Sequence, residues 1–127
     1  MFSDASKDAY AAVAYLVSSY QVATVTSRLI ASKCRVAPVK SVTIPRLELM
    51  GAVLASRLAQ SLLKVLNVDR TYFWADSENV SYWVHNQSRD FKPFVANRVG
   101  EIHRITSPEQ WHHVPGKDNP ADWQQGE

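Results

Sequence analysis

The sequence has a single cysteine, Cys34, and no apolar run close to the ~18 residues that a membrane-spanning helix needs. One cysteine permits neither an internal disulfide nor a cysteine-based zinc site. The first seven residues, Met-Phe-Ser-Asp-Ala-Ser-Lys, lack the basic start and apolar stretch of a secretory signal. Four glycines and six prolines are too few for a collagen-like or low-complexity chain. These absences predict a globular protein of a reducing compartment with no membrane partner.

Acidic residues are missing from the whole interval between Asp8 and Glu48, although the net charge of the chain is only +2. The cations of that interval are Arg28, Lys33, Arg35, Lys40 and Arg46. Such a group either forms a face that attracts phosphates or lies along a solvated edge strand. The sequence leaves both interpretations open.

The chain has 127 residues, of which 46% are hydrophobic, and this predicts a single domain over residues 1–127. Strand-forming residues fill 10–17 and 22–36, and residues 1–3 begin a further strand. Residues 18–21 are predicted to form a hairpin turn.

From Pro45 onward the apolar residues recur every three or four positions, which predicts a helix over 45–66. Its apolar stripe consists of Leu47, Met50, Leu54, Leu58, Leu62 and Val65. After it we expect a strand at 71–75, a helix from 76 or 77 to 83, a helix at 93–105, a strand at 110–114 and the opening of a helix at 119–122. The predicted order is β-β-β-α-β-α-α-β-(α). We expect a five-stranded mixed sheet with the fourth strand beside the first.

Four carboxylates stand where these elements begin or end, namely Asp4, Glu48, Asp76 and Asp122. Carboxylates held close together repel one another and need a cation, and hard oxygen ligands favour Mg²⁺ or Mn²⁺. Two such ions ~3.5–4 Å apart support phosphodiester hydrolysis. Each residue also has a structural interpretation, as a helix cap, a partner of a helix dipole or part of a turn.

Four stretches resemble, in order, the carboxylate motifs of retroelement ribonuclease H domains. They are Ser-Asp-Ala-Ser at 3–6, Arg-Leu-Glu-Leu at 46–49, Trp-Ala-Asp-Ser at 74–77, and the segment from His113 to Asp122. The stretches 31–49 and 91–99 are most similar to the Pao/BEL class of LTR retrotransposon polyproteins. The resemblance covers essentially the whole chain.

This resemblance implies an α/β ribonuclease H-like fold with helices on both faces of the sheet. It implies that Asp4, Glu48, Asp76 and Asp122 hold two Mg²⁺ ions, with Mn²⁺ as a substitute, and that the domain hydrolyses the RNA strand of RNA–DNA hybrids. The expected nucleic-acid contacts are Arg46, Ser77, Lys92, Arg98 and Lys117. Lys92 and Arg98 fit a solvated helix face equally well.

The same resemblance implies flanking polyprotein domains such as a reverse transcriptase. It also implies a place in a cytoplasmic retrotransposon particle, with the nucleus as the alternative.

Several positions depart from the ribonuclease H pattern. Ala5 replaces a glycine, Ile44-Pro45 stands where an RNA-reading asparagine is found, and Lys117 takes the place of a loop histidine. Five residues follow Asp122, so the last helix is truncated or altered. These departures support an alternative function, a non-catalytic nucleic-acid-binding or assembly module with the same fold.

Three further expectations concern local environment. The neighbouring His112 and His113 point to opposite faces of a strand, so they do not form a joint metal site. The tryptophans of the apolar elements, Trp74, Trp83 and Trp111, are predicted in the core. Crowding of the carboxylates should raise the pKa of at least one of them.

Overall fold

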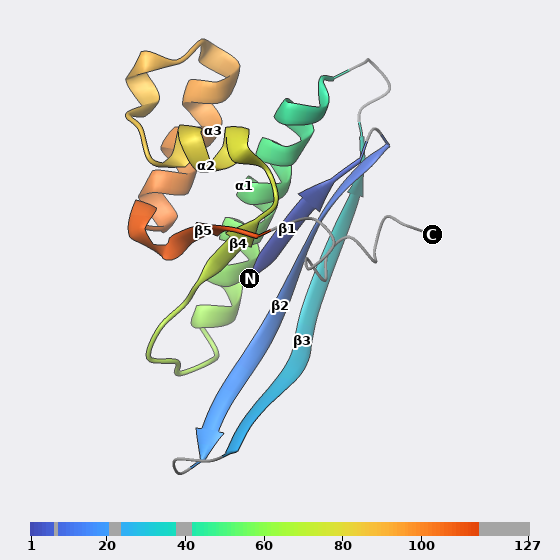
Figure 1. Ribbon diagram of the computed structural model, residues 1–127, viewed down its shortest axis with the longest axis vertical. Helices are drawn as coiled ribbons and strands as arrows, with labels where there is room; N and C mark the ends of the chain where they lie inside the picture. The colour runs from blue at the N-terminus through green and yellow to red at the C-terminus, as the bar shows by residue number, and fades with distance from the viewer. Residues whose placement is uncertain (7, 21–23, 38–41, 115–127) are drawn as a thin grey trace.

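Five strands form one mixed sheet in the computed structural model, which describes residues 1–6, 8–20, 24–37 and 42–114 (Figure 1). The strands are β1 (Phe2–Ala5), β2 (Ala9–Tyr20), β3 (Thr24–Val36), β4 (Phe73–Ala75) and β5 (Trp111–His113). Their order across the sheet is β3-β2-β1-β4-β5. Strands β1, β2 and β3 pair antiparallel, whereas β4 runs parallel to β1 and β5 parallel to β4. The predicted mixed sheet, with the fourth strand beside the first, is confirmed.

The β2–β3 hairpin is longer than the sequence predicted. Strand β2 continues to Tyr20 and β3 begins at Thr24, so the turn predicted at residues 18–21 is wrong. Ser18, Ser19 and Tyr20 of that segment belong to a strand because each pairs with a residue of β3. A register shift opposite Ala14 and Tyr15 bends the hairpin, as an extra residue in one strand does.

Helix α1 (Ile44–Leu63) begins beside Pro45 as predicted and ends three residues before the predicted 66. Leu47, Leu54 and Leu58 are buried, as expected. Leu62 is only partly buried, and Val65 is 79% exposed, because both lie at or beyond the end of the helix.

Residues on more than one side of α1 are buried, whereas the sequence predicted a single apolar stripe. The buried residues also include Leu49 and every position from 51 to 56. The cause is that α1 packs against β1 and β2 on one side and against α2 (Glu78–Val84) and α3 (Pro93–Ile105) on the other. A helix enclosed between two layers loses its solvent face.

The three described α-helices lie on one side of the sheet (Figure 1). Two short 3₁₀ helices, η1 (Ser88–Asp90) and η2 (Pro108–Gln110), connect the later elements. The expected opening of a helix at 119–122 lies outside the described residues. Within the described ranges, no helix is long and apolar enough to cross a membrane.

The core lies between this helical layer and the inner face of the sheet. Phe73 and Trp111 stack across neighbouring strands with ring centroids 4.6 Å apart. The Trp111 indole donates a hydrogen bond to the Thr106 hydroxyl at 2.8 Å, so its polar atom is satisfied inside the core. Trp111 is therefore a core residue as predicted, whereas Trp74 and Trp83 are only partly buried. Trp74 differs because strand alternation puts it on the opposite face from Phe73.

Candidate functional site

Two of the predicted site carboxylates come together through the register of β1 and β4. These parallel strands pair Phe2 with Trp74 and Ser3 with Ala75, so Asp4 and Asp76 occupy the next equivalent positions. Asp4 is inside the central strand and is 4% exposed, whereas Asp76 directly follows the end of β4. Adjacent parallel strands thus deliver two carboxylates to one point of the sheet.

Helix α1 supplies the third carboxylate, Glu48, from its first turns. The helix lies close to β1 because it carries a glycine where it crosses the strand. A Cβ atom on Gly51 would stand 3.1 Å from the main-chain oxygen of Asp4 and 3.6 Å from that of Ala11. One ligand oxygen from each of Asp4, Glu48 and Asp76 lies within 4.8 Å of the others. We call these three residues the acidic cluster.

The surroundings of the cluster change the pKa of Glu48, which is half-buried. Burial raises the pKa of the Glu48 carboxyl, and the neighbouring Asp76 charge raises it further, while a hydrogen bond with Ser77 lowers it. The net result is a pKa above the usual range. A raised pKa was expected from crowding of the carboxylates, but burial of Glu48 is its main cause and the charge of Asp76 only adds to it.

Ser77 has two structural tasks at this point. Its hydroxyl oxygen accepts a hydrogen bond at 3.1 Å from the main-chain N–H of Val80, which caps the N-terminus of α2. The same side chain is hydrogen-bonded to Glu48. The Ser77 side chain is 5% exposed, and through its hydrogen bond it supports Glu48 of the acidic cluster.

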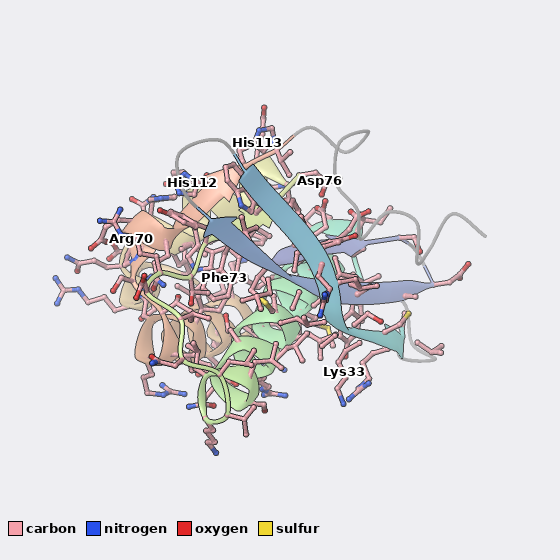
Figure 2. All side chains as sticks on the ribbon, turned by 90° about the horizontal axis from the view of Figure 1, so that it is seen from below. Lys33, Arg70, Phe73, Asp76, His112 and His113 are labelled. Carbon is pink, nitrogen blue, oxygen red and sulfur yellow. The ribbon has the colours of Figure 1, made fainter. Side chains whose placement is uncertain are left out.

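His113 contributes a contact that the sequence analysis missed. Its Nε2 atom lies 2.9 Å from the main-chain oxygen of Asp76, and the N–H of Val114 donates to the oxygen of Ala75 at 2.9 Å. Figure 2 shows Asp76 and His113 together at the edge of the sheet. β5 therefore fixes the end of β4, where Asp76 begins. No sequence signal indicates this contact, because it depends on the pairing of β5 with β4.

The other histidine of the pair lies elsewhere, as the alternation of a strand predicts. The His112 ring packs on Trp74, with centroids 4.8 Å apart, on the face of the sheet that carries Phe2. The acidic cluster is the group of potential metal ligands found among the described residues, and it contains no histidine.

Two of the predicted nucleic-acid contacts lie against one aromatic ring. The guanidinium groups of Arg46 and Arg98 both lie over the Phe94 ring, 4.8 Å and 4.0 Å from its centroid. They therefore join the first turn of α1 to α3 through cation–π contacts. Lys92 is exposed at the start of α3. Asp122 and Lys117 lie outside the described residues.

The donor set of the acidic cluster suits a hard divalent cation. Three carboxylates offer oxygen ligands, which Mg²⁺ and Mn²⁺ prefer, and no soft sulfur ligand is among them. A cation would also favour the charged form of Glu48, whose pKa is raised mainly by burial and further by the charge of Asp76. The residues present therefore fit the metal that the fold family implies.

Comparison with known proteins agrees with this arrangement. No curated protein matches the chain. A family model described as "Pao retrotransposon-like RNaseH-like domain" matches residues 1–77, which include β1 to β4 and all three residues of the acidic cluster. The match covers more than half of the 127 residues. The chain belongs to the Pao retrotransposon-like family of RNaseH-like domains.

Proposed function

We propose that this domain is a metal-dependent ribonuclease that hydrolyses the RNA strand of RNA–DNA hybrids. The observation that carries the proposal is the acidic cluster, in which three carboxylates from two strands and a helix approach within 4.8 Å. A ribonuclease H-like domain with a converging set of carboxylates has the ligands that two-metal phosphodiester hydrolysis requires.

Asp4, Glu48 and Asp76 would hold the ions in this proposal, and Asp122 is proposed as the fourth ligand. When bound, divalent ions supply an activated water and stabilise the charge on the leaving oxygen. Asp4 is the best-fixed ligand because it lies within the central strand, between β2 and β4. Ser77 holds the carboxylate of Glu48, and His113 holds the main chain at Asp76.

The experiment is a cleavage assay with a labelled RNA–DNA hybrid in the presence of Mg²⁺ or Mn²⁺. Asp76→Asn should abolish cleavage because the amide is a poor ligand for a hard cation and removes one charge. Asp69→Asn makes the same chemical change at an exposed position outside the cluster and should keep full activity. Equal cleavage by the wild type and Asp76→Asn would show that the ligand assignment is wrong.

The second candidate function is the non-catalytic nucleic-acid-binding or assembly module. Ile44-Pro45 favours it, because the apolar side chains of isoleucine and proline at the start of α1 offer no hydrogen bond to a 2′-hydroxyl. Tight hybrid binding with no hydrolysis in either metal would favour this second function over the first.

A further inference from the structure

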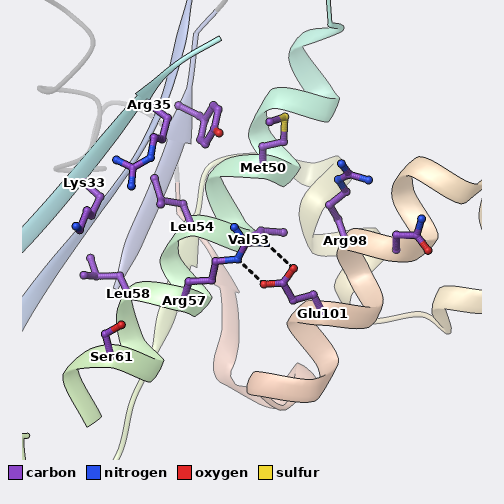
Figure 3. Close-up of a pocket in the computed structure, with 12 residues that line it drawn as sticks. Lys33, Arg35, Met50, Val53, Leu54, Arg57, Leu58, Ser61, Arg98 and Glu101 are labelled. Carbon is purple, nitrogen blue, oxygen red and sulfur yellow. Dashed lines mark hydrogen bonds and ion pairs between the residues drawn. The ribbon is translucent and has the colours of Figure 1, made fainter. Parts of the chain in front are cut away.

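A groove runs along α1 between the edge strand β3 and helix α3, with a volume of about 520 Å³ (Figure 3). Val53, Leu54 and Leu58 of α1 form its floor, and each is nearly buried. Because the floor is closed, the side chains that project from the two walls determine what the groove can bind.

Cations project from both walls of the groove. Lys33 and Arg35 come from β3, and Arg57 and Arg98 come from the two helices (Figure 3). The groove contains one carboxylate among its lining residues, Glu101, which gives these residues a formal excess of three positive charges.

Glu101 is already engaged by one of these cations. Arg57 donates to it from two nitrogen atoms, and the Nη2 to Oε1 distance is 2.8 Å. The hydrogen bond from Arg57 holds the pKa of Glu101 below its usual range, so the carboxylate stays charged and paired. Within the described residues, no other ion pair involves the groove, and the charges of Lys33, Arg35 and Arg98 face it without a carboxylate partner.

The strand register explains why two cations of β3 face inward. Lys33 pairs with Ala12 and Arg35 with Tyr10, and Ala12 faces the core. Inward-pointing charges on an edge strand discourage pairing with another sheet. This role explains why Lys33 and Arg35 point inward. It does not account for Arg98, which is on a helix across the groove and is oriented by its contact with Phe94.

One end of the groove lies at the first turns of α1, the part of the helix that also carries Glu48. Met50, two residues after Glu48, lines the groove, and so does Tyr10, which pairs with Ala5 beside Asp4. From Met50 to Ser61 the groove follows eleven residues of α1, or about 16 Å at 1.5 Å per residue. That length corresponds to about five base steps along a duplex axis at 3.4 Å per step.

We propose that this groove binds the phosphate backbone of a nucleic-acid strand, in a segment of the strand that lies outside the acidic cluster. Guanidinium groups on two facing walls suit phosphate oxygens because they donate several hydrogen bonds in a fixed plane. The proposal rests on the proposed function for the identity of the anion as nucleic acid. The groove would add a second point of attachment for the strand, separate from the point where it would be cut.

The experiment measures fluorescence anisotropy of a labelled RNA–DNA hybrid, a single-stranded RNA and a single-stranded DNA, in EDTA so that nothing is cleaved. The groove variant Lys33→Glu/Arg35→Glu is compared with Lys64→Glu/Arg70→Glu, which makes the same charge change at exposed positions outside the groove. Loss of two phosphate contacts should weaken hybrid binding roughly 60-fold at 0.1 M salt and lower the salt slope by about 2. The control variant should lose less than about threefold in affinity.

Arg98→Gln provides a test that leaves the edge strand intact, should the double variant fold poorly. It should lower the salt slope by about 1. A loss confined to the hybrid identifies a duplex as the occupant, and an equal loss for single strands identifies one strand. Equal losses for the groove and control variants, or a loss that is independent of salt, would overturn the proposal.

The two proposals fail in different ways. Asp76→Asn should bind the hybrid as tightly as the wild type in EDTA. A wild-type protein that binds through the groove but never cleaves would contradict the proposed function alone. Groove variants with unchanged hybrid affinity, in a protein that cleaves normally, would contradict the groove alone.

Discussion

Replacing Gly51 by alanine adds a methyl group where α1 crosses β1, next to the main chain of Asp4. The new Cβ would stand 3.1 Å from the Asp4 oxygen and 3.6 Å from the Ala11 oxygen. Both oxygens belong to paired strands, so neither can move away easily. We expect α1 to shift outward by a few tenths of an ångström and to carry Glu48 away from Asp4.

The magnitude follows from two opposing effects. Alanine is favoured over glycine inside a helix by about 1 kcal/mol, whereas overpacking a closed interface costs about 1–3 kcal/mol. The net expectation is a loss of about 1 kcal/mol in the free energy of unfolding. At about 2.1 cal/mol/K of unfolding entropy per residue, a chain of 127 residues would lose about 4 °C in Tm.

Gly100→Ala is the matched control because it makes the same change inside α3. Its Cβ would meet only side-chain atoms, the nearest being Nη1 of Arg104 at 3.6 Å. This variant should therefore gain about 0.5–1 kcal/mol, or roughly 2–4 °C in Tm.

The assay is thermal unfolding with and without Mg²⁺, with hybrid cleavage as a second measurement. A saturating ion that binds only the native state should raise the Tm of the wild type and of Gly100→Ala. Gly51→Ala should need several-fold more Mg²⁺ for the same rise and should cleave less hybrid. If Gly51→Ala gains as much stability as Gly100→Ala, the close approach of helix and strand does not constrain the cluster.

Three further predictions concern the charges of the cluster. Asp76→Asn should raise the Tm of the metal-free protein at neutral pH, because it removes the charge that raises the pKa of Glu48, and should reduce the stabilisation by Mg²⁺. Glu48→Gln should match the wild type in stability below the ordinary glutamate pKa of 4.5. Its advantage should grow between that value and the raised pKa, because the folded wild type must ionise a half-buried group, and should stay constant above the raised pKa; urea unfolding at several pH values measures this. Ser77→Ala should lower the free energy of unfolding by about 1 kcal/mol through loss of the α2 cap, and NMR titration should show the pKa of Glu48 higher than in the wild type.

Much of this fold could be predicted because local signals and burial agree. Pro45 at the start of α1, the serine cap before α2 and the short aromatic strand β4 each predict their element from a few residues. The turn at 18–21 failed because its polar residues resemble a turn, yet they pair along the hairpin. Strand pairing between distant segments outweighs such local preferences.

The acidic cluster was predictable in composition but not in its support. Asp4, Glu48 and Asp76 follow from family motifs, and their meeting follows from parallel pairing of β1 and β4. The contact of His113 with the main chain of Asp76 depends on the placement of β5, which the sequence does not specify. The basic groove depends on the distance between β3 and α3, two elements that never pair directly.

Burial is the main cause of the raised pKa of Glu48, and the nearby charge of Asp76, which the fold holds in place, adds to it. Carboxylates on flexible loops relieve repulsion by moving apart, but Asp4 is in a strand paired on both sides, and Gly51 lets α1 approach that strand closely. The remaining ways to relieve the repulsion are protonation of Glu48 or binding of a cation. The packing that stabilises the domain therefore also maintains an unfavourable charge arrangement, which a divalent ion would relieve. Because the same contacts fix the protein and the ligands, changes that loosen the helix–strand crossing should weaken metal binding more than they weaken the fold.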